Sequence, residues 1–154
     1  MRKFKTFLLL DRKLKLLLFE SYFYLGWARI LKSVPFSKVA PSLGIQMQET
    51  TTNNDFANKQ LLSSVSQAIH MMSRYTFWES QCLVKAIAAM KMLEKRNVES
   101  TLYLGTAKDE SGKLVAHAWL RSGSYYITGL EVMKQFTVVS KFAKNVYKEG
   151  EKYG

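Results

Sequence analysis

The chain has 154 residues, the length of a single domain. Its hydrophobic fraction of 47% and aromatic fraction of 13% can fill a packed core, which excludes an intrinsically disordered chain. The formal net charge is +11, and residues 1–48 hold nine of the basic residues against two acids. A basic surface can attract nucleic acid, anionic lipid or an acidic polypeptide, or it can simply be solvated.

The single cysteine, Cys82, excludes an internal disulfide framework and a multi-cysteine zinc site, and it suits a reducing cytoplasm. The apolar run Phe7–Leu10 is shorter than the roughly 7–15 residues of a secretory signal core. The run Leu16–Leu31 contains Glu20 and Arg29 and falls short of the ~20 residues that span a bilayer. The sequence therefore predicts a cytoplasmic protein, and it leaves open a peripheral contact of the basic, leucine-rich segment with a membrane.

Residues 1–54 are predicted to form a basic helical region followed by a connector. Leu14–Lys32 has the pattern of a helix that is apolar on most sides, which favours burial against other helices. Pro35 ends this helix, and the stretch that follows has room for one turn. Gln46–Asn54 is polar and typical of a mobile connector. The aromatic residues of the helix are assigned to a core or an interface rather than to nucleotide stacking: Phe19, Tyr22, Phe23, Tyr24 and Trp27.

Residues 55–154 are predicted to form the core unit, with the N-terminal region packed on it. Its first helix, capped by Asp55 or Asn58, runs to Met72 on a stripe of three- and four-residue spacing. His70 lies off this stripe, so we interpret it as a surface or packing histidine.

The next helix of this unit begins near Ser80 and ends at Asn97, a plausible C-terminal cap. The period then changes, and an antiparallel meander is predicted over Ser100–Thr106, Leu114–Arg121 and Ser124–Thr128. Phe136–Tyr147 is expected to be a strand or a short helix, and Lys148–Gly154 to be frayed. Helices followed by a meander predict the α+β class, with a cysteine-bearing helix packed on a small antiparallel sheet that bears a histidine.

Cys82 at the head of a helix and His117 inside a strand have the layout that papain-like and transglutaminase-like enzymes use to make a thiolate nucleophile. The thiolate is the attacking species, and a helix N-terminus with a nearby imidazolium lowers the pKa of a thiol. His117, which shares a strand face with Trp119, would accept the thiol proton and later donate it to the leaving amine. The residue pattern leaves open an inert thiol and a structural histidine.

The remaining groups of such a site are less clearly marked. Thr128, Glu131 or a backbone carbonyl could orient the imidazole, and Glu131 is the next acid after His117. The oxyanion of the tetrahedral intermediate would take the backbone N–H of Cys82, with the side chain of Gln81 as a second donor. No phosphate-binding loop of the Walker or dinucleotide type is present, and we expect neither a cofactor nor a metal.

Three segments in order carry a family resemblance: Cys82–Ala86, Ala116–Leu120 and Gln135–Val139. The aromatic helix that ends in Trp27–Leu31, followed by Val34–Phe36, agrees with it. The chain resembles the leader-processing protease of lasso-peptide biosynthesis, the transglutaminase-like "B protein", in its stand-alone form.

The resemblance implies a cysteine protease that removes the leader from a ribosomally made precursor peptide, with Cys82 as nucleophile and His117 as base. It implies that a separate ATP-dependent cyclase then closes the freed amine onto an Asp or Glu side chain. Because Met1–Lys32 is predicted to be helical, unlike the strands of a leader-recognition domain, a separate recognition protein is expected to deliver the substrate. No nucleic-acid partner is expected.

The chain departs from the family pattern at one position. The pattern is Cys-His-Asp, and the position where the Asp is expected holds Gly129. Two other functions stay open: a transglutaminase-like amidase or acyltransferase that uses the same dyad, and a non-enzymatic basic adaptor that binds nucleic acid or a membrane.

Overall fold

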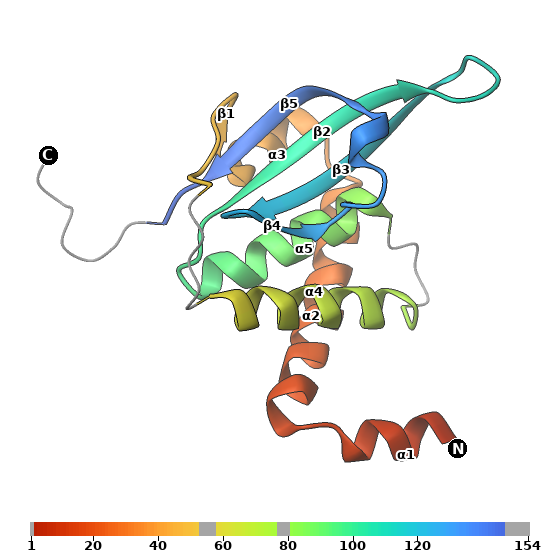
Figure 1. Cartoon of the computed structure of the whole chain (residues 1–154), viewed down its shortest axis with the longest axis vertical. Helices are drawn as coiled ribbons and strands as arrows, with labels where there is room; N and C mark the ends of the chain where they lie inside the picture. The colour runs from red at the N-terminus through yellow and green to blue at the C-terminus, as the bar shows by residue number, and fades with distance from the viewer. Residues whose placement is uncertain (1, 53–57, 77–80, 147–154) are drawn as a thin grey trace, which may run out of the picture.

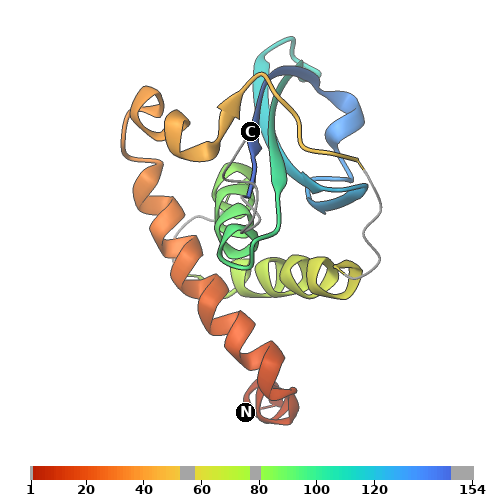
Figure 2. The same ribbon diagram turned by 90° about the vertical axis from the view of Figure 1, so that its left-hand side faces the viewer.

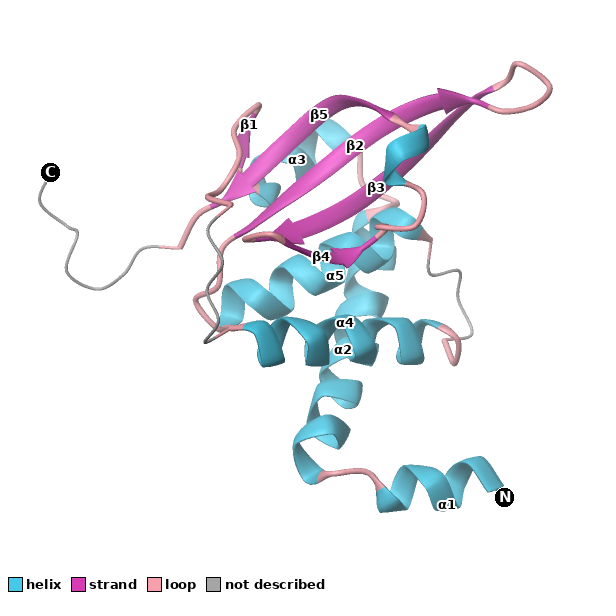
Figure 3. Ribbon diagram, viewed as in Figure 1, coloured by secondary structure: helices cyan, strands magenta, loops and turns pink. Residues whose placement is uncertain are grey.

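The computed structural model describes residues 2–52, 58–76 and 81–146. Its centre is a five-stranded sheet in the order β1-β5-β2-β3-β4, in which every neighbouring pair is antiparallel. Figures 1 and 3 show helices packed behind this sheet, which confirms the α+β class. The strands are β1 (Ile45–Gln46), β2 (Ser100–Lys108), β3 (Leu114–Ser122), β4 (Tyr125–Thr128) and β5 (Thr137–Lys144).

The helices are α1 (Arg2–Leu9), α2 (Arg12–Leu31), α3 (Phe36–Leu43), α4 (Lys59–Ser73), α5 (Cys82–Lys95) and the 3-10 helix η1 (Met133–Gln135). The predicted helices that end near Lys32, Met72 and Asn97 are confirmed as α2, α4 and α5. Helix α3 is longer than the single turn expected, because Val39 and Leu43 form a buried stripe along it. The segment expected to be a strand or a short helix contains β5, whereas Asp55, Ser80 and the stretch 148–154 lie outside the described residues.

Helix α5 is the central element of the core. Its small residues Ala86, Ala88 and Ala89 are fully buried, which allows close packing against the strands and helices around it. On one side it meets β2 and β3, and on the other it meets α2 and α4. The Arg96 guanidinium, just after α5, donates to both oxygens of Glu20 in α2 at 2.7 Å and ties these two helices together.

The end of α5 is set by local chemistry. Asn97 has a positive φ of 56°, a conformation that asparagine tolerates better than most residues. The N–H of Val98 donates to the carbonyl of Leu93, and the N–H of Asn97 donates to the carbonyl of Glu94, both at 3.0 Å. This pair of bonds is the Schellman motif, so the predicted cap at Asn97 is confirmed.

Each side of the sheet faces a different environment. Ala118 and Leu120 of β3 are buried in the core cluster with α5, so they mark the inner face. His117, Trp119 and Arg121 alternate with them and therefore project from the outer face. Figure 2 shows α5 on one side of the sheet, and η1 with the connector after β1 on the other.

Helix α2 is apolar on two opposite faces. Leu18, Leu25 and Ala28 are buried, whereas Phe19 and Phe23 are exposed. The expectation that this helix is buried on most sides is wrong for its first half, because α4 and α5 cover only one of its faces. Among the described helices, none is long and apolar enough to cross a membrane.

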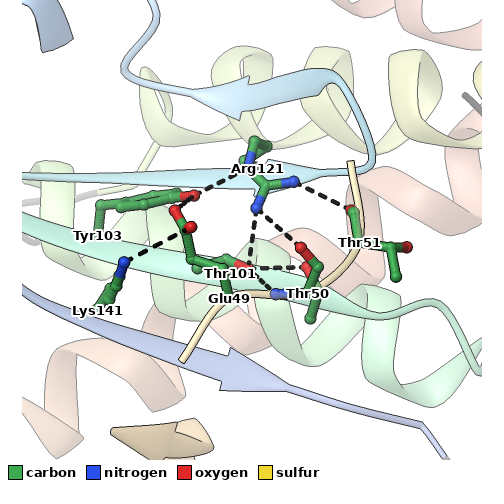
Figure 4. A network of polar contacts seen from close by, with 7 residues as sticks. All are labelled: Glu49, Thr50, Thr51, Thr101, Tyr103, Arg121 and Lys141. Carbon is green, nitrogen blue, oxygen red and sulfur yellow. Dashed lines mark hydrogen bonds and ion pairs between the residues drawn. The ribbon is translucent and has the colours of Figure 1, made fainter. Parts of the chain in front are cut away.

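The described part of the connector is held on the outer face, contrary to the mobile segment expected from its composition. The buried guanidinium of Arg121 donates to the carbonyl oxygens of Thr50 and Thr51, each at 3.1 Å. The Thr50 N–H donates to the hydroxyl of Thr101 at 2.9 Å (Figure 4). A buried cation requires acceptors, and the connector backbone supplies them.

Candidate functional site

Cys82 is the first residue of α5, and its half-buried thiol is free. Gln81 precedes it in an extended conformation, with φ of −73° and ψ of 173°. The chain thus enters the helix directly before the sulfur, where the first-turn N–H groups have no intrahelical acceptors. A negative charge that develops here lies at the positive end of the helix dipole.

His117 lies on β3 within a stack of aromatic rings. Its ring centroid is 5.1 Å from that of Phe136 and 6.2 Å from that of Trp119, which confirms that His117 and Trp119 share a face. Its Nε2 atom is buried and has no hydrogen-bond partner within the described part of the chain. A buried polar atom left unpaired is uncommon and often marks a catalytic or binding role.

The pKa of His117 is held below its usual value of 6.5, chiefly because burial disfavours the charged ring. The carboxylate of Glu131 acts in the opposite direction, and the ammonium of Lys85 lowers the pKa further. Lys85 lies one turn after Cys82 on α5, so the first turns of this helix are within electrostatic reach of the imidazole. The ring is therefore neutral at pH 7 and able to accept a proton.

Gly129 lies directly beside the unpaired nitrogen. A Cβ atom at this position would lie 3.2 Å from Nε2 of His117 and only 2.5 Å from Cβ of Trp119. Its φ of +79° is also a conformation that glycine adopts without strain. The position at which the family pattern expects an Asp is thus next to the imidazole and is packed so closely that glycine fits it best.

The structure separates the other predicted orienting groups from Nε2. Thr128 makes no hydrogen bond to His117, because neither its buried hydroxyl nor Nε2 has a partner among the described residues. Glu131 is exposed in the turn after β4 and acts on His117 through its charge, without a hydrogen bond to Nε2.

No hydrogen bond joins Cys82 to Nε2 of His117 in the described part of the chain. Helix α5 packs on the inner face, whereas His117 projects from the outer face beside Gly129, just after β4 ends. The hypothesis that the sulfur of Cys82 points at the sheet, where His117 can approach it, stays a prediction. Gln81 is the predicted side-chain donor to the oxyanion. Its amide oxygen accepts a hydrogen bond from the ammonium of Lys32, just after α2 ends.

Lys85 and Phe136 also contribute to this site, although neither was predicted from the sequence. Lys85 could have been found from its three-residue spacing from Cys82, which puts both on one side of a helix. Phe136 could not, because its stacking on His117 requires η1 to cross the outer face. Among the described residues, no three His, Cys, Asp or Glu side chains gather as metal ligands.

A family model described as the transglutaminase-like superfamily matches residues 30–141, a range that contains Cys82, His117 and Gly129. No similar sequence was found among the curated proteins, and no similar fold among the solved structures. Because the match covers most of the chain, the protein belongs to the transglutaminase-like superfamily.

Proposed function

We propose that the protein is a cysteine peptidase that removes the leader from a ribosomally made lasso-peptide precursor. The observation that carries the chemistry is the buried, unpaired Nε2 of His117 with its lowered pKa, in a domain whose one thiol begins α5. The substrate class rests on the resemblance of the cysteine, His-Ala-Trp and Phe-Thr segments to the leader-processing proteases.

In the proposed reaction, neutral His117 takes the proton of the Cys82 thiol, and the thiolate attacks the carbonyl carbon of the scissile peptide bond. The oxyanion is stabilised by the N–H of Cys82 and by Gln81. Imidazolium then donates its proton to the leaving amine, and a water molecule hydrolyses the thioester to release the leader and regenerate the thiol. Glu131 favours the imidazolium through its charge and fills the third role in part.

The partners follow from the same proposal. A separate recognition protein delivers the leader, and an ATP-dependent cyclase uses the amine that cleavage frees. The reaction takes place in the cytoplasm, where the thiol stays reduced.

The test is a mixture of precursor, recognition protein and this chain, read by mass spectrometry. We expect two fragments whose masses add up to the precursor plus one water. Cys82→Ala abolishes the cleavage, whereas His70→Ala, a change at the other histidine, leaves it intact. His70 is a suitable control because its Nδ1 is 2.7 Å from the backbone oxygen of Ser66, a contact that lies within α4. Cleavage that survives Cys82→Ala would remove the assigned nucleophile.

Superfamily membership also supports a second candidate, an acyltransferase that uses the same dyad. The two are distinguished by adding a primary amine to the assay. A peptidase yields the acid, whereas an acyltransferase yields a product in which the amine has replaced ammonia or the leaving peptide. No reaction of either kind, together with tight DNA binding that weakens steeply with salt, would favour the basic adaptor instead.

A further inference from the structure

The N-terminal end of the molecule carries apolar side chains that the described part of the chain leaves uncovered. Leu8 and Leu9 in α1 are 56% and 87% exposed, and Leu16, Phe19 and Phe23 in α2 are 63%, 64% and 68% exposed. Figures 1 and 2 both show that α1 and the first half of α2 project away from the sheet. We call these five residues the N-terminal patch. Large apolar side chains exposed together at one end of a molecule point to an interaction site.

The patch has an unusual structural setting. Helix α1 makes no extensive contact with any other described helix or strand. A helix of eight residues is too short to persist in water on its own, so its stability depends on a surface that covers its apolar side. The elbow to α2 is nevertheless fixed, because the Lys15 ammonium donates to the carbonyl of Leu8 at 2.7 Å. Helix α1 and the start of α2 are thus linked, and both expose apolar residues on the part of the chain that projects from the domain.

The charge around the patch indicates what covers it. Residues 2–15 contain six basic residues and a single acid, Asp11. Arg2, Lys5, Arg12 and Lys13 are all exposed beside the apolar side chains. Exposed leucine and phenylalanine flanked by lysine and arginine is the composition of a helix that lies in a membrane interface. Anionic lipid headgroups attract such a cluster of basic side chains. Because α1 and the start of α2 project from the domain, they can lie against a planar surface.

We propose that α1 and residues 12–23 of α2 bind the surface of an anionic lipid bilayer. The basic side chains pair with headgroups, and the N-terminal patch enters the boundary between headgroups and acyl chains. The patch lies before residue 30, where the match to the transglutaminase-like family begins. Membrane binding is therefore a property that this chain adds to the family domain, and it does not depend on the proposed peptidase activity.

The test is co-sedimentation of the full chain with two kinds of vesicle: phosphatidylcholine alone, and phosphatidylcholine mixed with phosphatidylglycerol. We expect binding to the mixed vesicles, weakening with added salt, and little binding to phosphatidylcholine alone. Neutralising three cations of the segment, in Lys5→Gln with Arg12→Gln and Lys13→Gln, should weaken binding about a hundredfold, since each contributes about fivefold. The matched control neutralises three exposed lysines elsewhere and keeps full binding: Lys38→Gln with Lys108→Gln and Lys113→Gln.

The apolar half of the proposal has its own pair of variants. Leu9→Ser with Leu16→Ser and Phe19→Ser should release the chain from mixed vesicles by at least tenfold, whereas Leu114→Ser with Val139→Ser, also exposed, should not. All five positions are on the surface, so circular dichroism should show unchanged folding. Equal binding to both vesicles, or no binding by the unaltered chain, would overturn the proposal. Self-association lost in the apolar variant, without vesicle binding, would assign the patch to a second copy instead.

Discussion

Two residues on strand β3, Arg121 and His117, lie four positions apart on the same outer face, yet their environments are opposite. The three guanidinium nitrogens of Arg121 donate to the carbonyls of Thr50 and Thr51 and to the hydroxyls of Thr101 and Tyr103 (Figure 4). The carbonyl of Gly123 is a fifth acceptor. The Nε2 of His117 is buried with no partner in the described chain. A complete polar network stabilises and orients the fold, whereas an incomplete one lowers stability and is retained where a reaction uses it.

The titratable groups around Arg121 and around His117 also differ in their pKa values. The pKa of Tyr103 is raised to about 12, chiefly by burial, and the pKa of Glu49 is lowered, chiefly by the hydrogen bond from Tyr103. Neither group changes its protonation near pH 7. The pKa of His117 is lowered from 6.5, chiefly because burial disfavours the charged ring. Tyr103 and Glu49 thus keep a constant charge near pH 7, whereas His117 has a neutral ring that can accept a proton.

The largest effect on stability is expected from removing the hydrogen-bond network around Arg121. Arg121→Ala leaves the hydroxyl of Tyr103 and the connector carbonyls without their donor, and should reduce the free energy of unfolding by about 3–5 kcal/mol. Arg121→Lys keeps the charge but cannot reproduce the planar fork, so an intermediate loss is expected. Urea denaturation followed by circular dichroism measures both. A midpoint unchanged in Arg121→Ala would show that the network contributes little to stability.

Part of the secondary structure and burial could be predicted from the sequence. Periodicity identified α2, α4, α5 and the meander, because each buries a regular stripe of side chains. It could not assign the burial of Phe19 and Phe23, since which face of an apolar helix is covered depends on its neighbours. The position of the connector was equally hidden, because its threonines contribute backbone carbonyls to Arg121, and backbone groups leave no trace in composition.

The residues of the candidate site could be proposed from the sequence, but their arrangement in space could not. A lone thiol and a strand histidine could be identified from residue type and context, and Gly129 from the family pattern. Strand alternation placed His117 with Trp119 correctly. That α5 packs on the other face follows only from tertiary structure, in which the alanines of α5 meet Ala118 and Leu120. The glycine's steric role depends on the approach of Trp119 to within 2.5 Å of a Cβ position, which no spacing rule reveals.

The next largest effect is expected at Gly129. Gly129→Ala forces a side chain against Trp119 at a positive φ, and should destabilise the fold by about 2–3 kcal/mol. Gly129→Asp carries the same strain but adds a carboxylate beside Nε2, and its charge should raise the pKa of His117. NMR titration of the imidazole separates the two variants. Equal pKa values in Gly129→Ala and Gly129→Asp would mean that this position does not face the ring.

A smaller change in stability is expected from His117→Phe, which keeps a flat ring between Phe136 and Trp119 but removes the unpaired nitrogen. The free energy of unfolding at pH 7 should stay the same or rise by about 1 kcal/mol, while precursor cleavage is lost. Loss of stability on the scale expected for Arg121→Ala would instead make His117 a structural residue.

The same variant tests the pH dependence. Because the pKa of His117 is lower in the folded state, the unfolded chain binds more protons below pH 6.5, and stability falls as the pH falls through that window. His117→Phe should remove this part of the loss. The carboxylates of Glu20, Glu49 and Glu94 also have lowered pKa values, but their loss begins near their ordinary 4.5 and lies at more acidic pH. Chemical denaturation at about pH 7.0, 5.5 and 4.0 separates the loss of stability due to His117 from the loss due to the carboxylates.

The smallest effect is expected from Glu131→Gln. Glu131 raises the pKa of His117 by its charge alone, so removing that charge should lower the imidazole pKa further. The side chain is exposed and screened by solvent, so this lowering should be small and should diminish further at high salt. Glu110→Gln, an exposed acid in the turn between β2 and β3, should leave the pKa unchanged. If Glu131→Gln instead raised the pKa, or if its shift were independent of salt, the carboxylate would not act on His117 through the field proposed for the third catalytic role.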